Sequence, residues 1–326
     1  MKVLFIGGTG VISSGCAPEA LASGFELTLL NRGKSFRAAP QGAEVLVADY
    51  HDQAAVERVL AGREFDVVVD WIAFTPDQVA RDIAMFQGRV GQFILISSAS
   101  AYQKPPRSLP ITESTPLENP FWAYSRNKIA CEQVLMEAYF KDGFPGTIVR
   151  PSHTYDKTMV PLRGKITALI RLLEGRPVIV HGDGTSLWVL THHQDFATGF
   201  VGLMGNPHAV GEAFHITSDE LLTWNQITEL VAAAAGVEAN IVHLTSERIN
   251  RYDPEWGAGL LGDKAHSVIF DNSKLKRFVP NFRAKIPFYQ GAQEIVDWYL
   301  ADRSRLQAEF DPILDQLIDR MIAENQ

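Results

Sequence analysis

The sequence predicts an α/β fold in which a doubly wound parallel sheet is followed by a smaller C-terminal lobe. In the first 150 residues, short apolar runs alternate with stretches of helical period, and this alternation requires parallel strands joined by right-handed crossovers. The runs are continuously apolar and several are rich in Val and Ile, which is typical of strands buried on both faces of a sheet. Ligands of such sheets bind at the carboxyl ends of the strands.

The elements follow one another along the chain. Strands are expected at 3–6, 27–30, 45–47, 66–69, 93–96 and 147–149, with helical patterns between most of them. Beyond these we expect a helix around 166–173, a strand at 178–181, a helix around 196–204, a strand at 213–216 and a helix through 234 that Thr223 caps. Asp311 and Pro312 start a last amphipathic helix, whose apolar face carries Ile313, Leu314, Leu317, Ile318 and Met321.

Composition excludes several classes of protein. The 326 residues are 46% hydrophobic and 21% charged, which excludes a disordered chain, collagen and a coiled coil. Thirty basic against 38 acidic residues give a net charge of −8, so nucleic acid is an unlikely main partner. No apolar stretch approaches the length of a membrane span or a signal-peptide core. Cys16 and Cys131 lie far apart without a disulfide pattern, and we expect a cytoplasmic protein.

A glycine-rich turn directly follows the first strand. The segment from Gly7 through Thr9 to Gly10 links that strand to a helix, which is the context that a dinucleotide-binding turn requires. Glycines let the backbone approach a pyrophosphate, whose charge then faces the amides at the helix N-terminus. We therefore predict a Rossmann-type cofactor site that includes these three residues with Val11 and Ile12, although a purely structural turn is the alternative.

The end of the second strand predicts which dinucleotide is preferred. An acid that would bind the ribose of NAD is absent there, and the residues present are Asn31 and Arg32. A guanidinium pairs well with the 2′-phosphate of NADP, so NADP is preferred and NAD remains possible. Alternatively, Arg32 is a solvated loop charge. Asp49 and Tyr50, at the end of the third strand, are expected near the adenine.

Three side chains have the chemistry for hydride transfer. Ser98 follows the strand at 93–96, and Tyr124 and Lys128 are spaced four residues apart on a predicted helix. This spacing places the ammonium beside the phenol, where it lowers the phenol pKa from about 10. A phenol with a lowered pKa is a general acid or base for a hydroxyl/carbonyl pair, which hydride transfer to a nicotinamide demands.

Together these motifs resemble those of an extended, atypical short-chain dehydrogenase/reductase of the NAD-dependent epimerase/dehydratase family. The matching pieces are GGTGVIS, SSASAY, YSRNK, the segment RPSHTY and DNSK. The second strand ends in Asn-Arg-Gly, as in the branch that contains chloroplast stem-loop-binding proteins. The resemblance implies that Ser98, Tyr124 and Lys128 are the catalytic triad and that the chain forms a homodimer. It further implies that the dinucleotide is contacted by Ile72, Ala73, Phe74, Pro151 and His153.

Several positions depart from the pattern of that family. Ala99 and Ser100 replace the acidic pair of the dehydratases, which disfavours water elimination. Trp188 replaces an arginine that serves nucleotide-diphosphate sugars, and its ring suits stacking on a sugar, although packing between the lobes is the alternative. His153 and Asp156 also differ from the family pattern and are expected to remodel the floor of the substrate pocket.

The remaining expectations concern contacts and metals. The provisional substrate contacts are Ser100, Tyr102 and Trp188. His192 and His193 are adjacent, and neighbours in a strand point to opposite faces, so no metal site is expected.

The sequence thus favours an NAD(P)-dependent oxidoreductase or epimerase that acts on a hydroxyl/keto group of a small sugar-like or polyol substrate. Tyr124 would be the general acid/base. We expect residues 1–155 to form the NAD(P)-binding Rossmann domain, with 187–217 returning to it, and 156–326 to form mainly a substrate-binding lobe and C-terminal helices. The alternative is a catalytically minor dinucleotide-binding protein with a regulatory or RNA-binding role.

Overall fold

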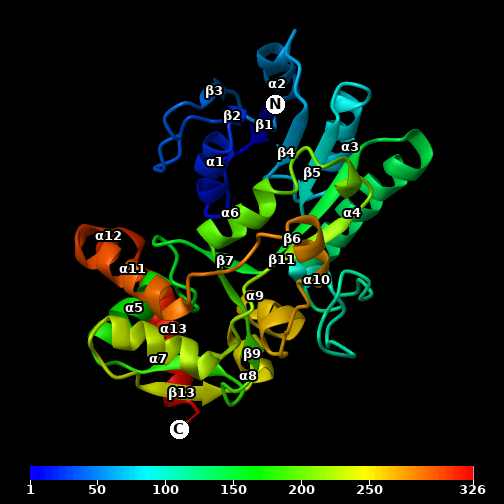
Figure 1. Cartoon of the computed structure of the whole chain (residues 1–326). Helices are drawn as coiled ribbons and strands as arrows, with labels where there is room; N and C mark the ends of the chain where they lie inside the picture. Colours follow the sequence, from blue (N-terminus) through cyan, green and yellow to red (C-terminus); the bar gives the residue numbers. More distant parts are fainter. Residues whose placement is uncertain (326) are drawn as a thin grey trace.

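A seven-stranded parallel sheet forms the upper half of the molecule in Figure 1 and confirms the predicted fold class. The structure, a computed structural model, describes residues 1–325. The strand order is β11-β6-β5-β4-β1-β2-β3. These strands are β1 (Lys2–Ile6), β2 (Glu26–Asn31), β3 (Glu44–Val47), β4 (Val67–Asp70), β5 (Gln92–Ile96), β6 (Gly146–Pro151) and β11 (Ala213–Ile216).

Helices cover both faces of this sheet because successive strand residues point to opposite sides. Val3 and Phe5 pack on one face, which is covered by α1 (Ser13–Ala22) and α6 (His193–Val201). Leu4 and Ile6 pack on the other, which is covered by α2 (Gln53–Leu60), α3 (Pro76–Phe86) and α4 (Ala123–Asp142). The central strands are therefore buried on both sides, as their apolar runs predict, whereas the edge strand β3 exposes Val45 and Val47.

The second lobe lies below the sheet in Figure 1, where the C-terminus is also found. Its core is made by α5 (Ile166–Leu173), α7 (Trp224–Ala234) and α11 (Phe288–Leu300). Three short strand pairs surround this core: β7 (His153–Tyr155) with β10 (Leu190–His192), β9 (Leu187–Trp188) with β12 (Leu222–Thr223), and β8 (Val178–His181) with β13 (Ile241–Leu244). The other elements are η1 (Ala99–Ala101), η2 (Pro207–Ala209), α8 (Ser246–Tyr252), α9 (Pro254–Gly259), η3 (Leu260–Lys264), α10 (Ser273–Phe278), α12 (Ser304–Glu309) and α13 (Pro312–Ala323).

Most of the expected elements beyond the sheet occur, with two corrections. α7 starts after the Thr223 cap and α13 after the Asp311 cap, as expected. α6 begins at His193, three residues earlier than expected, because the His192 side chain caps it. Ile313 was expected on the buried face of α13 but is 80% exposed, since the buried stripe of that helix runs through Leu314 and Ile318 instead. Among residues 1–325, every helix is too short or too polar to span a membrane.

A glycine allows α1 and α6 to approach each other closely. A β-carbon on Gly15 would lie 2.5 Å from the backbone oxygen of His193, which is inside van der Waals contact. In a dinucleotide-binding turn a third glycine usually brings the helix close to its neighbours, and Ser13 stands at that position here. Gly15 instead allows the close approach of α1 to α6. Ser13 serves the turn itself, because its Oγ accepts a hydrogen bond of 2.8 Å from the Gly10 amide.

We expect Gly15→Ala to lower the free energy of unfolding by about 1–3 kcal/mol, because the added methyl meets a backbone atom that moves only with α6. Gly259→Ala is the matched control. That helical glycine has no heavy atom within 4 Å of an added β-carbon, so the change should be neutral or slightly stabilising. Urea unfolding curves of the two variants measure both effects, and equal midpoints would show that the α1–α6 contact tolerates a side chain.

Candidate active site

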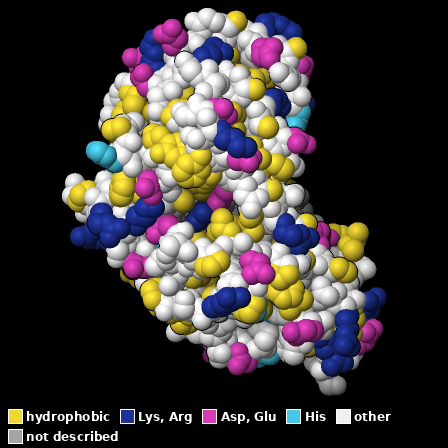
Figure 2. Space-filling model, turned by 90° about the vertical axis from the view of Figure 1, so that its right-hand side faces the viewer, with side chains coloured by type: hydrophobic (Ala, Val, Ile, Leu, Met, Phe, Trp, Pro, Cys, Tyr) yellow, Lys and Arg dark blue, Asp and Glu magenta, His cyan; other side chains and the backbone are white. Residues whose placement is uncertain are grey.

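A cavity of about 620 Å³ lies at the carboxyl ends of the central strands. Figure 2 shows the surface hollowed between the two halves of the molecule, with charged side chains of both signs at the recess. Most residues predicted to hold the dinucleotide line this cavity together: Gly7, Thr9, Gly10, Val11, Ile12, Asn31, Arg32, Asp49, Tyr50, Ile72 and Phe74.

The turn after β1 has the backbone geometry that glycines allow. Gly7 and Gly8 have φ angles of 105° and 93°, which other residues rarely adopt. A β-carbon on Gly8 would also lie 2.7 Å from the Leu29 side chain. The backbone of the turn is therefore open to the cavity at the start of α1, where amide groups face an anion. These residues fit a dinucleotide.

A buried cluster behind the cavity holds the loop after β4. Asp70 is fully buried and accepts hydrogen bonds from the amides of Ile72 (2.7 Å) and Ala73 (2.9 Å). The Tyr50 hydroxyl donates to Asp70 (3.2 Å) and to Asp82 (2.9 Å). Burial, together with the charge of Asp70, raises the pKa of Asp82 well above its usual range. The charged form of Asp82 is therefore disfavoured in the folded chain.

This cluster was not predicted from the sequence, although Asp70 directly follows the strand predicted at 66–69. The partners lie 20 and 32 residues from Tyr50, so no local spacing connects them. The cluster nevertheless fixes two walls of the cavity, since Tyr50 and the segment after Asp70 both line it.

Helix α4 presents a row of polar residues to the sheet. Tyr124, Lys128 and Glu132 recur every four residues and so share one face of the helix. The Lys128 ammonium is buried and donates to the carbonyls of Ala73 (2.7 Å) and Ile96 (2.8 Å). Ala73 lies under this ammonium and does not line the cavity.

Glu132 anchors the same helix more deeply. Its carboxylate accepts two hydrogen bonds from Arg150, at 2.9 and 2.6 Å, and both side chains are almost fully buried. The Ser97 hydroxyl donates to the same carboxylate. This ion pair connects α4 to the ends of β5 and β6. It was not predicted, although the four-residue spacing from Lys128 places Glu132 on the sheet side.

The Tyr124 ring lies between two aromatic residues, one from the cavity described above and one from a second cavity described below. Its centroid lies 6.1 Å from that of Phe74, which lines the first cavity, and 4.8 Å from that of Trp122, which lines the second. Burial raises the pKa of Tyr124, and the interaction with the Ser98 hydroxyl partly opposes the shift. This corrects the expectation that Lys128 lowers that pKa, because the Lys128 ammonium is turned toward two backbone carbonyls instead.

Three serines form a chain of hydroxyl groups beside Tyr124. The Ser98 and Ser100 oxygens lie 2.9 Å apart, and Ser125 donates to Ser100 over 2.8 Å. Ser100 is only 3% exposed, so it orients Ser98 and has no open contact with a ligand. Its predicted role as a substrate contact is therefore corrected to support of Ser98.

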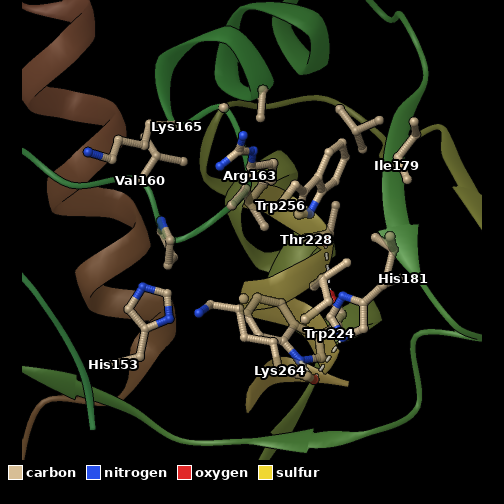
Figure 3. A pocket seen from close by; sticks show the side chains of 18 of the residues that line it. His153, Val160, Arg163, Lys165, Ile179, His181, Trp224, Thr228, Trp256 and Lys264 are labelled. Atoms are coloured by element: carbon tan, nitrogen blue, oxygen red, sulfur yellow. Dashed lines mark hydrogen bonds between the residues drawn. The ribbon is translucent and has the colours of Figure 1, made fainter. Parts of the chain in front are cut away.

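A second cavity, of about 300 Å³, lies within the second lobe (Figure 3). Its lining includes Trp122, Trp224 and Trp256 beside aliphatic side chains, and His153 and Lys264 face each other in it. His153 was predicted to contact the dinucleotide, but it lies in this cavity, away from the glycine turn. Pro151 is buried in β6 and lines neither cavity.

His153 is neutral and has a fixed tautomer. Burial, aided by the charge of Lys264, lowers the pKa of His153 to about 3. Its Nδ1 accepts a hydrogen bond of 3.1 Å from the indole nitrogen of Trp188, so the proton of the neutral ring is on Nε2.

Two other predicted substrate contacts are corrected by burial. Trp188 is 4% exposed and packs on Trp224, with ring centroids 5.3 Å apart, so the packing alternative holds for it. Tyr102 is 0% exposed, and its hydroxyl bonds to His215 at 3.0 Å. Neither residue has an open face for a substrate.

Asp156 has a different role from the one expected, and the two adjacent histidines do not lie in one strand. Asp156 binds Arg37, with the Nε donating over 3.1 Å, and so ties the loop after β2 to the second lobe instead of forming a pocket floor. His193 starts α6 and is not in a strand, and its ring centroid lies 4.8 Å from that of His192. Within residues 1–325, no group of three or more His, Cys, Asp or Glu residues suits a metal ion.

Known proteins resemble this chain over most of its length. The profile of the NAD dependent epimerase/dehydratase family matches residues 3–217. The chain is 25% identical over 296 residues to a 2′-dehydrokanamycin reductase of Streptomyces kanamyceticus, covering 87% of this chain and 81% of that protein. It is 29% identical over 259 residues to the chloroplast stem-loop binding protein of 41 kDa b of Arabidopsis thaliana, covering 74% of this chain and 65% of that protein.

The fold is similar to that of solved structures. A UDP-glucose 4-epimerase from Bifidobacterium longum, in complex with NAD⁺ and UDP, superposes with a TM-score of 0.76 at 19% identity, covering 94% of this chain and 100% of the other.

The raised pKa of Asp82 generates a prediction for stability against pH. A carboxyl with a raised pKa keeps its proton in the folded chain after the unfolded chain has lost it. The free energy of unfolding then falls as pH rises above about 4, by at most about 1.4 kcal/mol per pH unit for one proton. Asp82→Asn supplies a donor and an acceptor but cannot ionise, so this fall should disappear and the variant should gain relative stability toward neutral pH.

Unfolding by urea between about pH 4 and 7 measures this difference. Asp77→Asn changes an exposed carboxyl on the same helix and should leave the pH dependence of the wild type intact. Parallel curves for Asp82→Asn and the wild type would mean that Asp82 is ionised in the folded protein.

Proposed function

Because the chain belongs to the NAD dependent epimerase/dehydratase family, we propose that it is an NADP-preferring oxidoreductase or epimerase. Its substrate is a small sugar-like or polyol molecule with a hydroxyl/keto group. The observation that carries the proposal is the position of Tyr124, whose ring contacts Phe74 of the first cavity and Trp122 of the second. A dinucleotide in the first cavity and a substrate in the second would meet at this side chain.

The chain supplies the proton transfer and the orientation of the substrate. A bound nicotinamide supplies or accepts the hydride. Tyr124 gives a proton to the substrate oxygen during reduction and takes it back during oxidation. Ser98, which interacts with Tyr124, donates a hydrogen bond to the same oxygen. Lys128 fixes the loop after β4 through the Ala73 carbonyl. We propose that its ammonium also contacts the ribose of a bound dinucleotide.

The preference for NADP is supported by the end of β2. Arg32 lines the first cavity and is exposed, and within residues 1–325 it forms no ion pair that would occupy its charge. The Asn31 side-chain oxygen accepts a hydrogen bond of 2.8 Å from the Gly33 amide. This bond shapes the loop that carries the Arg32 guanidinium. A 2′-phosphate would therefore meet an unpaired charge.

Two further parts of the proposal concern assembly and the rival function. A homodimer through α4 is supported by Phe140 on that helix, which is 77% exposed, and the cytoplasm is the expected compartment.

An RNA-binding role is favoured only by the resemblance to the chloroplast stem-loop binding protein. Titration with NADPH beside an RNA shift assay at two salt concentrations separates the two functions, because RNA binding through phosphates weakens steeply with salt.

Tyr124→Phe tests the proposed proton transfer. We expect the variant to bind NADPH within about twofold of the wild type and to lose turnover by a factor of at least about 100, because only the transferring oxygen is removed. Tyr139→Phe makes the same change on α4 outside both cavities and should be fully active. Fluorescence titration of NADPH and steady-state rates give the two readouts. Full turnover by Tyr124→Phe on the true substrate would overturn the proposed catalytic role.

Arg32→Ala tests the proposed cofactor preference. The wild type should bind NADP(H) about tenfold to a hundredfold more tightly than NAD(H), since a charge-assisted contact contributes about 1.5–3 kcal/mol. The variant should lose most of this ratio. Arg58→Ala, an exposed arginine on α2, should keep it. Calorimetry with both dinucleotides measures the ratios, and equal affinities in the wild type would refute the preference.

A further inference from the structure

We infer that the substrate carries a single anionic group, which the Lys264 ammonium binds inside the second cavity. The inference rests on the proposed function, because it assigns a substrate class to the cavity beside Tyr124. Lys264 ends η3 and reaches the cavity from the second lobe (Figure 3). Its charge, its neighbours and the walls of the cavity each contribute to the argument.

The charges around Lys264 do not balance. Asp263 is the nearest carboxylate, at 3.9 Å from the Lys264 ammonium, which is too far for a hydrogen bond. The other oxygen of Asp263 lies 2.8 Å from the ammonium of Lys104, which is fully buried. One carboxylate therefore serves two ammonium groups, and Lys264 has no hydrogen-bond acceptor within residues 1–325.

The nearby groups leave this positive charge uncompensated. Arg163, which also lines the cavity, is already paired with Asp253 at 2.6 Å. Glu255 and Lys165 line the cavity with exposed side chains of opposite charge. Burial and the nearby cations lower the pKa of Lys264, so the site disfavours the charged ammonium until an anion joins it.

His153 completes the polar side of the site. Figure 3 shows the Lys264 ammonium pointing toward the His153 ring. Because His153 is neutral with its proton on Nε2, it can donate a hydrogen bond to an anion without adding charge. A cation and a neutral donor across a short gap suit one carboxylate or one phosphate monoester.

The walls define the rest of the ligand. The Lys264 ammonium lies 5.4 Å from the ring centroid of Trp122 and 5.6 Å from that of Trp188. Such rings stabilise a cation, but they do not replace an oxygen atom as a hydrogen-bond acceptor. The volume of about 300 Å³ is at the lower end of the range for small-molecule sites. The site therefore fits a sugar-sized ring with one acidic substituent better than a nucleotide sugar.

We expect the fold to survive replacement of the Lys264 side chain. The hydrogen bonds that hold this residue go to its backbone carbonyl, which accepts from His181 at 2.8 Å and from Trp224 at 3.2 Å. Neither bond uses a side-chain atom of Lys264. Lys264→Gln removes the charge, Lys264→Arg keeps it, and Lys157→Gln removes an exposed lysine outside the cavity.

The test measures binding to the NADP-loaded protein by quenching of tryptophan fluorescence. The probes share one ring: D-glucose, D-glucuronate and D-glucose 6-phosphate, with UDP-glucose as the larger anion. At least one of the two singly substituted anions should bind about tenfold to a hundredfold more tightly than glucose and more tightly than UDP-glucose. Comparison of the two anions tells a carboxylate site from a phosphate site.

The variants decide whether Lys264 causes the preference. Lys264→Gln should reduce the ratio of anion to glucose affinity to about one, whereas Lys264→Arg and Lys157→Gln should retain it within about threefold. The inference is wrong if neither anion binds more tightly than glucose, or if the preference survives in Lys264→Gln. This test measures binding, whereas Tyr124→Phe tests turnover. Each proposal can therefore fail while the other stands.

Discussion

The buried ion pair between Glu132 and Arg150 holds α4 against the sheet. It joins α4 to the ends of β5 and β6, and Lys128 and Tyr124 follow at four-residue intervals toward the start of the helix. Removing one partner from such a pair leaves an uncompensated charge in the interior, at a cost of about 3–5 kcal/mol. The depth of Lys128 and the contacts of Tyr124 with Phe74 and Trp122 therefore depend on an ion pair that lines neither cavity.

Local signals in the sequence predicted the parts of the structure that local forces determine. The strands, the glycine turn and the caps Thr223 and Asp311 each depend on residues within a few positions, and each occurs in the structure. Helix α4 was predicted from the spacing of Tyr124 and Lys128, and it occurs in the structure. Spacing does not give the solvent exposure of a side chain. The direction of the Tyr124 pKa shift was therefore predicted wrongly, and the choice between stacking and packing for Trp188 was left open.

The unpredicted parts of the site come from contacts between distant segments. Asp82 shares the Tyr50 hydroxyl with Asp70, and Arg37 crosses from the sheet half to Asp156 in the second lobe. Each contact unites residues from separate loops or helices, and the pairing appears only once the chain has folded. Of the residues in these two contacts, only Tyr50 lines the first cavity.

The neutral histidine in the second cavity changes how a kinetic pH profile of this protein should be interpreted. An inflection near neutrality is usually assigned to histidine. Burial holds the pKa of His153 near 3 and that of His181 near 4, so neither ring changes charge across the neutral range. An inflection there would instead come from the ligand or from a group other than these two rings.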